Sequence, residues 1–173
     1  MQPRNNERGI SLLEVVFAAG LVAGAFAALA QLFAFAAADT MSARSRSAAT
    51  VLAAQKMEQL RGLAWVLDTS GTPVSDTTTD TAAPVESPAG GTGLSPSPAG
   101  TLRGNTAGYV DYLDRWGNSL GGGGTTPPAA LYTRRWSITP LPDRPDTLAL
   151  QVVVTGPHGS SARLDTLRTR SVP

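Results

Sequence analysis

Residues 10–38 read ISLLEVVFAAGLVAGAFAALAQLFAFAAA, and this stretch decides the fold. It contains no proline, and its only charged residue is Glu14. Roughly 20 apolar residues in a helix span the hydrocarbon core of a bilayer, so the stretch predicts a transmembrane helix. A carboxylate at the centre of such a helix costs about 2.5–3.5 kcal/mol, and its presence indicates a function. Glu14 lies near the start of the stretch, where the positive end of the helix dipole lowers that cost.

The glycine before this stretch and the carboxylate inside it form a pattern. Its members are Gly9, Ile10, Leu12, Leu13 and Glu14. The pattern resembles the processing signature of type IV pilins and of the pseudopilins of type II secretion. The resemblance implies that residues 1–9 are a leader, which a prepilin peptidase removes by cutting after Gly9. It also implies that the new N-terminus at Ile10 is methylated and that Glu14 guides assembly with other subunits.

Two simpler interpretations compete with this one. A secretory signal has an apolar core of about 7–15 residues and a small-x-small cleavage site. Ala28-Leu29-Ala30 offers such a site, but the apolar stretch is too long and an acidic residue is out of place within it. A plain signal anchor with a chance glutamate leaves the spacing between Gly9 and Glu14 unexplained.

Residues 39–67 are predicted to continue the helix as an amphipathic segment. They contain no proline and one glycine, Gly62. Apolar residues at helical spacing form one stripe, which we expect to pack against the rest of the protein. The stripe consists of Ala53, Met57, Leu60, Ala64 and Leu67. The charged residues expected to lie off the stripe are Arg44, Arg46, Lys56, Glu58 and Arg61.

The composition changes after this helix. Residues 68–107 are rich in Thr, Ser, Pro, Gly and Ala, which predicts a long flexible loop. Residues 108–173 contain strand-like runs with short connections, which predict a small antiparallel sheet of three or four strands. A second flexible loop is expected at the glycine run 121–124. The predicted fold is therefore α+β, with a long N-terminal helix packed on a small antiparallel sheet.

Alternation indicates which strand residues share a face, because successive side chains of a strand point to opposite faces. One face of the run 131–139 comprises Tyr132, Arg134, Trp136 and Ile138. One face of the next run comprises Leu148, Leu150, Val152 and Val154.

Little in the sequence indicates chemistry. The single histidine, His158, sits in a turn between glycines, and no nucleophile motif accompanies it, so we expect no catalytic residue. The pairs Asp111/Asp114 and Asp143/Asp146 have too few oxygen ligands for a calcium site, so no metal or cofactor is expected. The net charge is +1 and no basic patch surrounds Arg134 and Arg135, so no nucleic-acid partner is expected. The chain has no cysteine, which excludes disulfides and thiolate metal sites.

The resemblance implies a structural subunit and not an enzyme. It implies a minor pseudopilin or minor pilin that helps to initiate or cap a pseudopilus for secretion or pilus biogenesis. The expected partners are the prepilin peptidase, the inner membrane, and other pilin or pseudopilin subunits reached through the N-terminal helix. The segment 10–38 would lie in the membrane or filament core, with the C-terminal domain in the periplasm. The alternative is a membrane-anchored exported domain with a ligand-binding or enzymatic role unrelated to pili.

Overall fold

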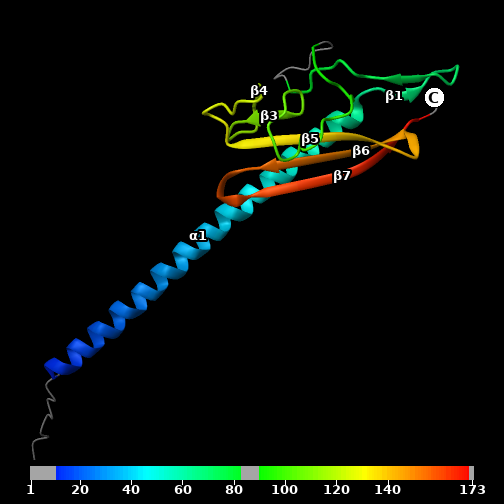
Figure 1. Ribbon diagram of the computed structural model, residues 1–173. Coiled ribbons are helices and arrows are strands. Elements are labelled where there is room, and N and C mark those ends of the chain that lie inside the picture. The colour runs from blue at the N-terminus through cyan, green and yellow to red at the C-terminus, as the bar shows by residue number, and fades with distance from the viewer. Residues whose placement is uncertain (1–10, 83–89, 172–173) are drawn as a thin grey trace, which may run out of the picture. The chain divides into compact units, whose positions relative to one another are not determined.

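Helix α1, Leu12–Gly62, is continuous through the predicted membrane and amphipathic segments. The computed structural model describes residues 11–82 and 90–171. The chain divides into two units, Met1–Met41 and Ser42–Pro173 (Figure 1). In the first unit every described residue, from Ser11 to Met41, is exposed. This part of α1 is long and apolar enough to cross a membrane.

The second unit is built on a five-stranded antiparallel sheet. Its strands lie in the order β4-β3-β5-β6-β7. Their bounds are β3 Val110–Leu113, β4 Ser119–Gly122, β5 Tyr132–Leu141, β6 Arg144–Thr155 and β7 Ser161–Thr169. A separate hairpin pairs β1, Trp65–Leu67, with β2, Pro73–Ser75. The structure confirms the α+β class, but the main sheet has five strands instead of the expected three or four.

The extra strand comes from the glycine run that was expected to be a flexible loop. Gly122 pairs with Asp111 across β3 and β4. A Cβ at Gly122 would lie 2.5 Å from the carbonyl oxygen of Val110, so only glycine allows the backbones to approach this closely. The hydroxyl of Tyr112 also donates to the carbonyl of Gly123 at 2.7 Å, which attaches the end of this strand to the sheet.

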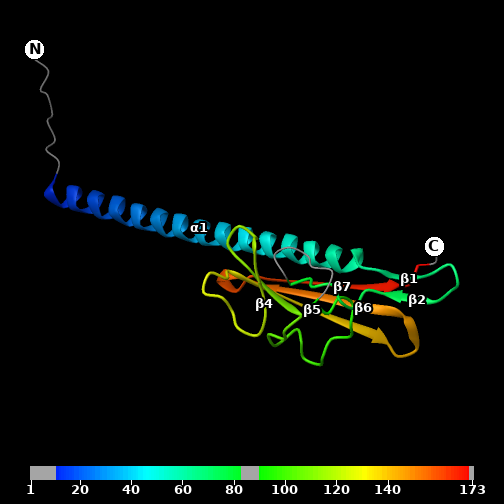
Figure 2. The same cartoon turned by 90° about the horizontal axis from the view of Figure 1, so that it is seen from above.

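The C-terminal part of α1 packs along one face of this sheet, as both views show (Figures 1 and 2). The core between them contains Ala49, Leu52, Ala53, Met57 and Leu60 from α1, Trp136 and Ile138 from β5, and Leu148, Leu150, Val152 and Val154 from β6. The strand residues are those that alternation placed on one face. Burial of this apolar surface, at about 25 cal/mol per Å², is the main force that holds helix and sheet together.

The helix is shorter than expected at its C-terminal end. It ends at Gly62 and not at Leu67, and the chain continues into β1. Glycine is a poor helix former because its backbone loses the most entropy. Arg168 of β7 donates to the carbonyls of Leu60 at 2.9 Å and Leu63 at 2.6 Å, which satisfies acceptors that the helix end leaves free.

The described residues of this segment, 68–82 and 90–107, are more structured than the prediction of one long flexible loop. They include strand β2, and the described residues Leu94 and Thr101 are buried. The backbone N–H of Ser97 donates to the carbonyl of Ile138 in β5 at 2.9 Å. The two residues in such a contact lie far apart in the sequence, so the polar composition of this segment did not indicate it.

Candidate functional site

Glu14 lies in the first turn of α1 and is exposed. Its backbone N–H donates to the carbonyl of Ser11 at 2.9 Å, and the hydroxyl of Ser11 accepts the N–H of Leu13 at 3.3 Å. Ser11 and Glu14 therefore have the spacing of a capping box, in which the first polar residue caps the helix and the glutamate lies three positions later. A negative charge at this end also interacts favourably with the helix dipole. The charge of Glu14 therefore suits the start of this helix, in addition to any role between subunits.

The predicted cleavage site lies outside the described residues. This applies to Gly9, to Ile10 and to the rest of the leader, residues 1–9. The described chain starts at Ser11, immediately after the predicted new N-terminus.

The first unit presents an apolar surface that water solvates poorly. Its exposed large apolar side chains are Leu12, Leu13, Val15, Val16, Phe17, Leu21, Val22, Phe26, Leu29, Leu32, Phe33, Phe35 and Met41. Soluble monomers rarely expose a contiguous apolar patch larger than a few hundred Å². The surface of this helix therefore requires a cover of lipid or of other protein chains.

Three of the five residues predicted to pack against the sheet lie in the core. Ala53 and Leu60 are fully buried, and Met57 is nearly so. The prediction is wrong for Ala64 and Leu67, because the helix has ended before them. Ala64 is exposed, and Leu67 is half-buried in β1.

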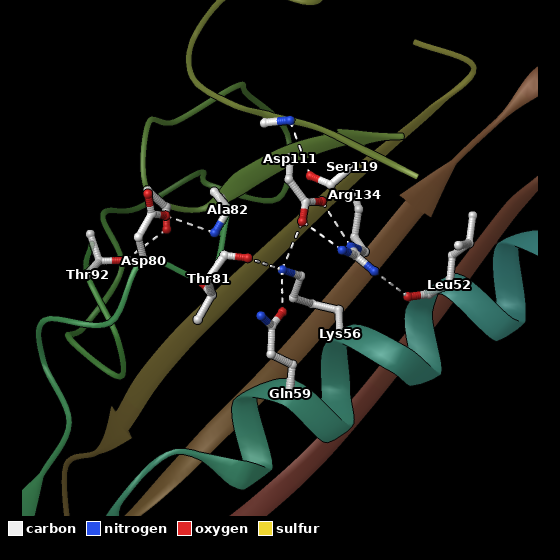
Figure 3. A network of polar contacts seen from close by, with 12 residues as sticks. Leu52, Lys56, Gln59, Asp80, Thr81, Ala82, Thr92, Asp111, Ser119 and Arg134 are labelled. Carbon is white, nitrogen blue, oxygen red and sulfur yellow. Dashed lines mark hydrogen bonds and ion pairs between the residues drawn. The ribbon is translucent and has the colours of Figure 1, made fainter. Parts of the chain in front are cut away.

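A buried cluster of charges joins α1 to the sheet, and it is shown in Figure 3. Lys56 of α1 and Arg134 of β5 both point toward Asp111 of β3. The Lys56 Nζ lies 2.8 Å from Asp111 Oδ2. Arg134 binds the same carboxylate through two bonds, from Nε to Oδ1 at 2.9 Å and from Nη2 to Oδ2 at 2.7 Å. Lys56 is fully buried, and Asp111 and Arg134 nearly so.

The cluster contains two cations and one carboxylate, so other acceptors share the positive charge. Lys56 Nζ also donates to the carbonyl of Thr81 and to Gln59 Oε1, each at 2.7 Å, and lies 4.2 Å from the centre of the Trp136 ring. Arg134 Nη1 donates to the carbonyl of Leu52 at 3.0 Å. Buried charges are tolerated when every donor and acceptor is satisfied in this way. The cluster therefore links α1 to β3 and β5 through buried polar contacts.

The sequence-based prediction for Lys56 is wrong, because it was placed off the packing stripe. A lysine has an apolar stem, so one can lie on the buried face when its ammonium group finds partners. Alternation places Arg134 on the strand face that it shares with Trp136 and Ile138, but the sequence did not indicate that this face is buried. A buried arginine needs a carboxylate, but the sequence did not indicate that Asp111 supplies it.

A second set of contacts fixes the C-terminal end of the helix. The guanidinium of Arg170 stacks on the Trp65 ring, with its Cζ 3.4 Å from the ring centre, and pairs with Asp146 at 3.0 Å.

The pKa of Arg168 is lowered by partial burial of its guanidinium away from water and, to a smaller extent, by the nearby positive charge of Arg61. Since an arginine pKa is normally above 12, Arg168 still carries its charge at neutral pH.

Histidine, aspartate and glutamate are the side chains that could hold a metal ion in the part of the chain that the structure describes. In residues 11–82 and 90–171 no three His, Asp or Glu side chains converge as metal ligands would. His158 is exposed in the turn between β6 and β7, where its backbone has a positive φ of 54°. No known protein family, curated protein or solved structure matches this chain.

Proposed function

We propose that this chain is a minor subunit of a type IV pilin-like assembly, either a minor pseudopilin of type II secretion or a minor pilin. The observation that carries the proposal is the exposed apolar part of α1 with a single carboxylate, Glu14, in its first turn. The same helix continues without a break into the core of the second unit. A subunit of this kind inserts its apolar helix into a bundle and presents its C-terminal domain outside the membrane.

Glu14 would set the register of the bundle. Cleavage after Gly9 would create a protonated amine at Ile10, and the carboxylate of a neighbouring subunit would pair with it. Inside a bundle an unpaired charge is strongly penalised, so helices that align the two groups are favoured over helices in other registers. In a single subunit the carboxylate lies near the lipid headgroups, where it needs no such partner.

The proposed location follows from the same features. The apolar part of α1 would anchor the protein in the inner membrane as a single span, with the second unit in the periplasm. The prepilin peptidase and other pilin-like subunits would be its partners. The chain would act in starting or capping a short pseudopilus and not as an enzyme.

Cleavage and assembly test this proposal together. N-terminal sequencing of the membrane-extracted protein should begin at Ile10, and Gly9→Leu should keep the leader. Glu14→Leu should still be cleaved and inserted, but it should lose cross-links to neighbouring subunits and fail to support secretion or pilus formation. Glu14→Gln should be intermediate, since it keeps hydrogen bonding but not the charge.

A matched control separates assembly from helix capping. Ser11→Ala removes the cap of the same helix turn, which costs about 1 kcal/mol, but leaves the carboxylate in place. We expect Ser11→Ala to assemble normally. An N-terminus at Met1, or normal assembly of Glu14→Leu, would contradict the proposal and favour a membrane-anchored domain of another kind.

A further inference from the structure

Strand β7 forms an open edge of the main sheet. It is the last strand in the order β4-β3-β5-β6-β7, as Figure 1 shows. Among the described residues, no other backbone group pairs with its outer side from Ser161 to Leu167. Such an edge presents a row of N–H and C=O groups to which a strand of another chain can be added.

Hydrogen bonds at the two ends of β7 determine which of its backbone groups point outward. The N–H of Gly156 donates to the carbonyl of Ser160, and the N–H of Arg170 donates to the carbonyl of Asp146, each at 2.9 Å. Both bonds lie in the register of β6 with β7. Bonded and non-bonded pairs alternate along an antiparallel ladder, so the even-numbered residues of β7 bond to β6. The odd-numbered residues direct their N–H and C=O groups away from the sheet.

β7 lacks the features that commonly protect an edge strand from pairing. It contains no proline and no lysine, and it pairs with β6 without a bulge. Its exposed charges compensate each other, because Arg163 pairs with Asp165 at 3.0 Å. The opposite edge, β4, has only 4 residues, ends on two glycines and pairs irregularly with β3. β7 is therefore the edge that suits a further strand.

The direction of β7 restricts which strand can be added. Ser45 of α1 donates to Ser160, just before the start of β7, at 2.7 Å. Arg168, near the end of β7, donates to the carbonyl of Leu60, further along α1, at 2.9 Å. β7 therefore runs in the same direction as this part of α1. Because each strand of the main sheet is antiparallel to its neighbour, the other edge strand, β4, runs in that direction as well.

A second copy of this chain does not supply a suitable strand. Subunits that are inserted in one membrane with one topology have their α1 helices pointing the same way, so both edge strands of a second copy would run parallel to β7. Parallel sheets occur almost only where both faces are covered. The outer face of β7 is exposed at Arg163, Asp165 and Leu167. The strand that fits is therefore antiparallel to β7 and belongs to a different protein.

We infer that β7 binds an extended segment of a different pilin-like subunit, which extends the sheet by one antiparallel strand. The inference rests on the proposed function: pairing of two strands alone is marginally stable in water, and the bundled helices would hold the subunits close together. The segment should alternate, with apolar residues beside Ala162 and Leu164, which pack against the core, and polar residues beside Arg163 and Asp165. An edge for a non-identical neighbour suits a subunit that starts an assembly.

Photocrosslinking of the full-length protein in cells tests the added strand. A photoreactive amino acid replaces Ser161 in one variant and Leu167 in another, and mass spectrometry maps the linked residues. Both probes should link to the same partner subunit, at positions about six residues apart (167 minus 161). The position linked to the Leu167 probe should come first in the partner's sequence, because the strands are antiparallel. The reverse order, links to a second copy of this chain, or links to scattered positions would overturn the inference.

A matched pair of substitutions separates the backbone of β7 from its side chains. Leu167→Pro removes an N–H that points outward, and Leu167→Ala shortens the same side chain but keeps that N–H. Both should melt at similar temperatures, since Leu167 is 65% exposed. In the chain with the Ser161 probe, Leu167→Pro should abolish the cross-link and Leu167→Ala should keep it. Equal behaviour of the two variants would overturn backbone pairing. If Leu167→Pro unfolds the sheet, the order of the two mapped positions still decides.

A third probe, in place of Phe26, keeps failure of this inference distinct from failure of the proposed function. Phe26 is exposed in the middle of the apolar helix and would contact any neighbouring helix in a bundle. If the Phe26 probe links to neighbouring subunits but neither probe in β7 does, strand pairing is wrong and the assembly proposal stands. If none of the three probes links, both are wrong.

Discussion

Asp111 is the residue on which the buried charge cluster depends. Its carboxylate is shared by Lys56 and Arg134 and accepts three bonds of 2.7–2.9 Å. Asp111→Ala would leave two buried cations without a counter-charge. We therefore expect it to lower the free energy of unfolding by about 3–5 kcal/mol.

Lys56→Met is the matched comparison at the same site. It leaves the two-bond pair between Arg134 and Asp111 intact and removes the surplus positive charge. The carbonyl of Thr81 loses a donor, which should cost about 2 kcal/mol. Urea unfolding of the detergent-solubilised protein, followed by near-UV circular dichroism, measures both. A larger loss for Lys56→Met than for Asp111→Ala would show that the carboxylate does not organise the cluster.

Asp114 gives the β3–β4 turn a dependence on pH. The side chain of Asn118, and then the backbone N–H groups of Asn118, Trp116 and Gly117, hydrogen-bond the carboxylate and lower its pKa, against a smaller effect of desolvation. Because the pKa of Asp114 is lower in the folded state than its unfolded value of about 4, the ionised carboxylate stabilises the turn fully at any pH above that unfolded value. That contribution disappears as the pH falls through the lower folded-state value. NMR shifts of the Trp116 and Asn118 amides should therefore titrate below pH 4.

Asp114→Asn serves as the control for this titration. It keeps an acceptor for the backbone N–H groups but has no proton to gain, so the amide shifts should no longer follow an acid titration. A midpoint above pH 4 in the unmodified protein would contradict the direction of the pKa shift.

At the level of elements, helix α1 has one face in the core and one in solvent. Leu60 is fully buried, whereas its neighbour Arg61 is exposed and pairs with exposed Glu58 at 2.9 Å. Leu60→Asp places an unpaired carboxylate in the core. It should lower the free energy of unfolding of the second unit by about 3 kcal/mol or more. Arg61→Asp loses only a surface ion pair, worth about 0.2–1 kcal/mol, and also removes a positive charge near Arg168.

Thermal melts of the two variants distinguish these effects. Leu60→Asp should melt at a much lower temperature than the unmodified protein, and Arg61→Asp at nearly the same temperature. The opposite order would mean that the buried face of α1 is wrongly assigned.

Elements also show where prediction from the sequence reaches its limit. The alternation in β5 and β6 grouped the residues that share a face, because the side-chain period of a strand is a local property, but it did not indicate which face is buried. The end of α1 was placed five residues too late (67 minus 62). The apolar spacing continues to Leu67, but the acceptors of the helix end are satisfied by Arg168, which is more than 100 residues away in the sequence. Strand β4 was missed because glycine is a poor strand former, and the close approach of Gly122 to Val110 that favours glycine here is a tertiary contact.

At the level of the whole molecule, the core belongs to one unit. Its members in the described part of the chain run from Ala49 to Val154, all within Ser42–Pro173. A protein that begins at Ser42 should therefore fold, be monomeric without detergent, and keep the near-UV circular dichroism of Trp136. The full-length chain should require detergent, because its first unit exposes many large apolar side chains. Size-exclusion chromatography and circular dichroism check both statements. An unfolded fragment would show that residues 1–41 are needed for the core.

The sequence by itself determined the long apolar helix, the position of its single carboxylate and the α+β class. These features depend on composition and on the spacing of apolar residues, which repeat every 3.6 residues in a helix and every 2 residues in a strand. Both are properties of short stretches of the chain. Only the tertiary structure decided that Lys56, Asp111 and Arg134 meet, that Arg168 binds the carbonyls of Leu60 and Leu63 at the helix end, and that Trp116 stands in solvent. The residues in these contacts come from separate elements, so their partners are chosen by how the helix and the strands pack. A charged residue on a helix has the same local pattern whether it is solvated or buried with a distant counter-ion, and burial alone separates the two.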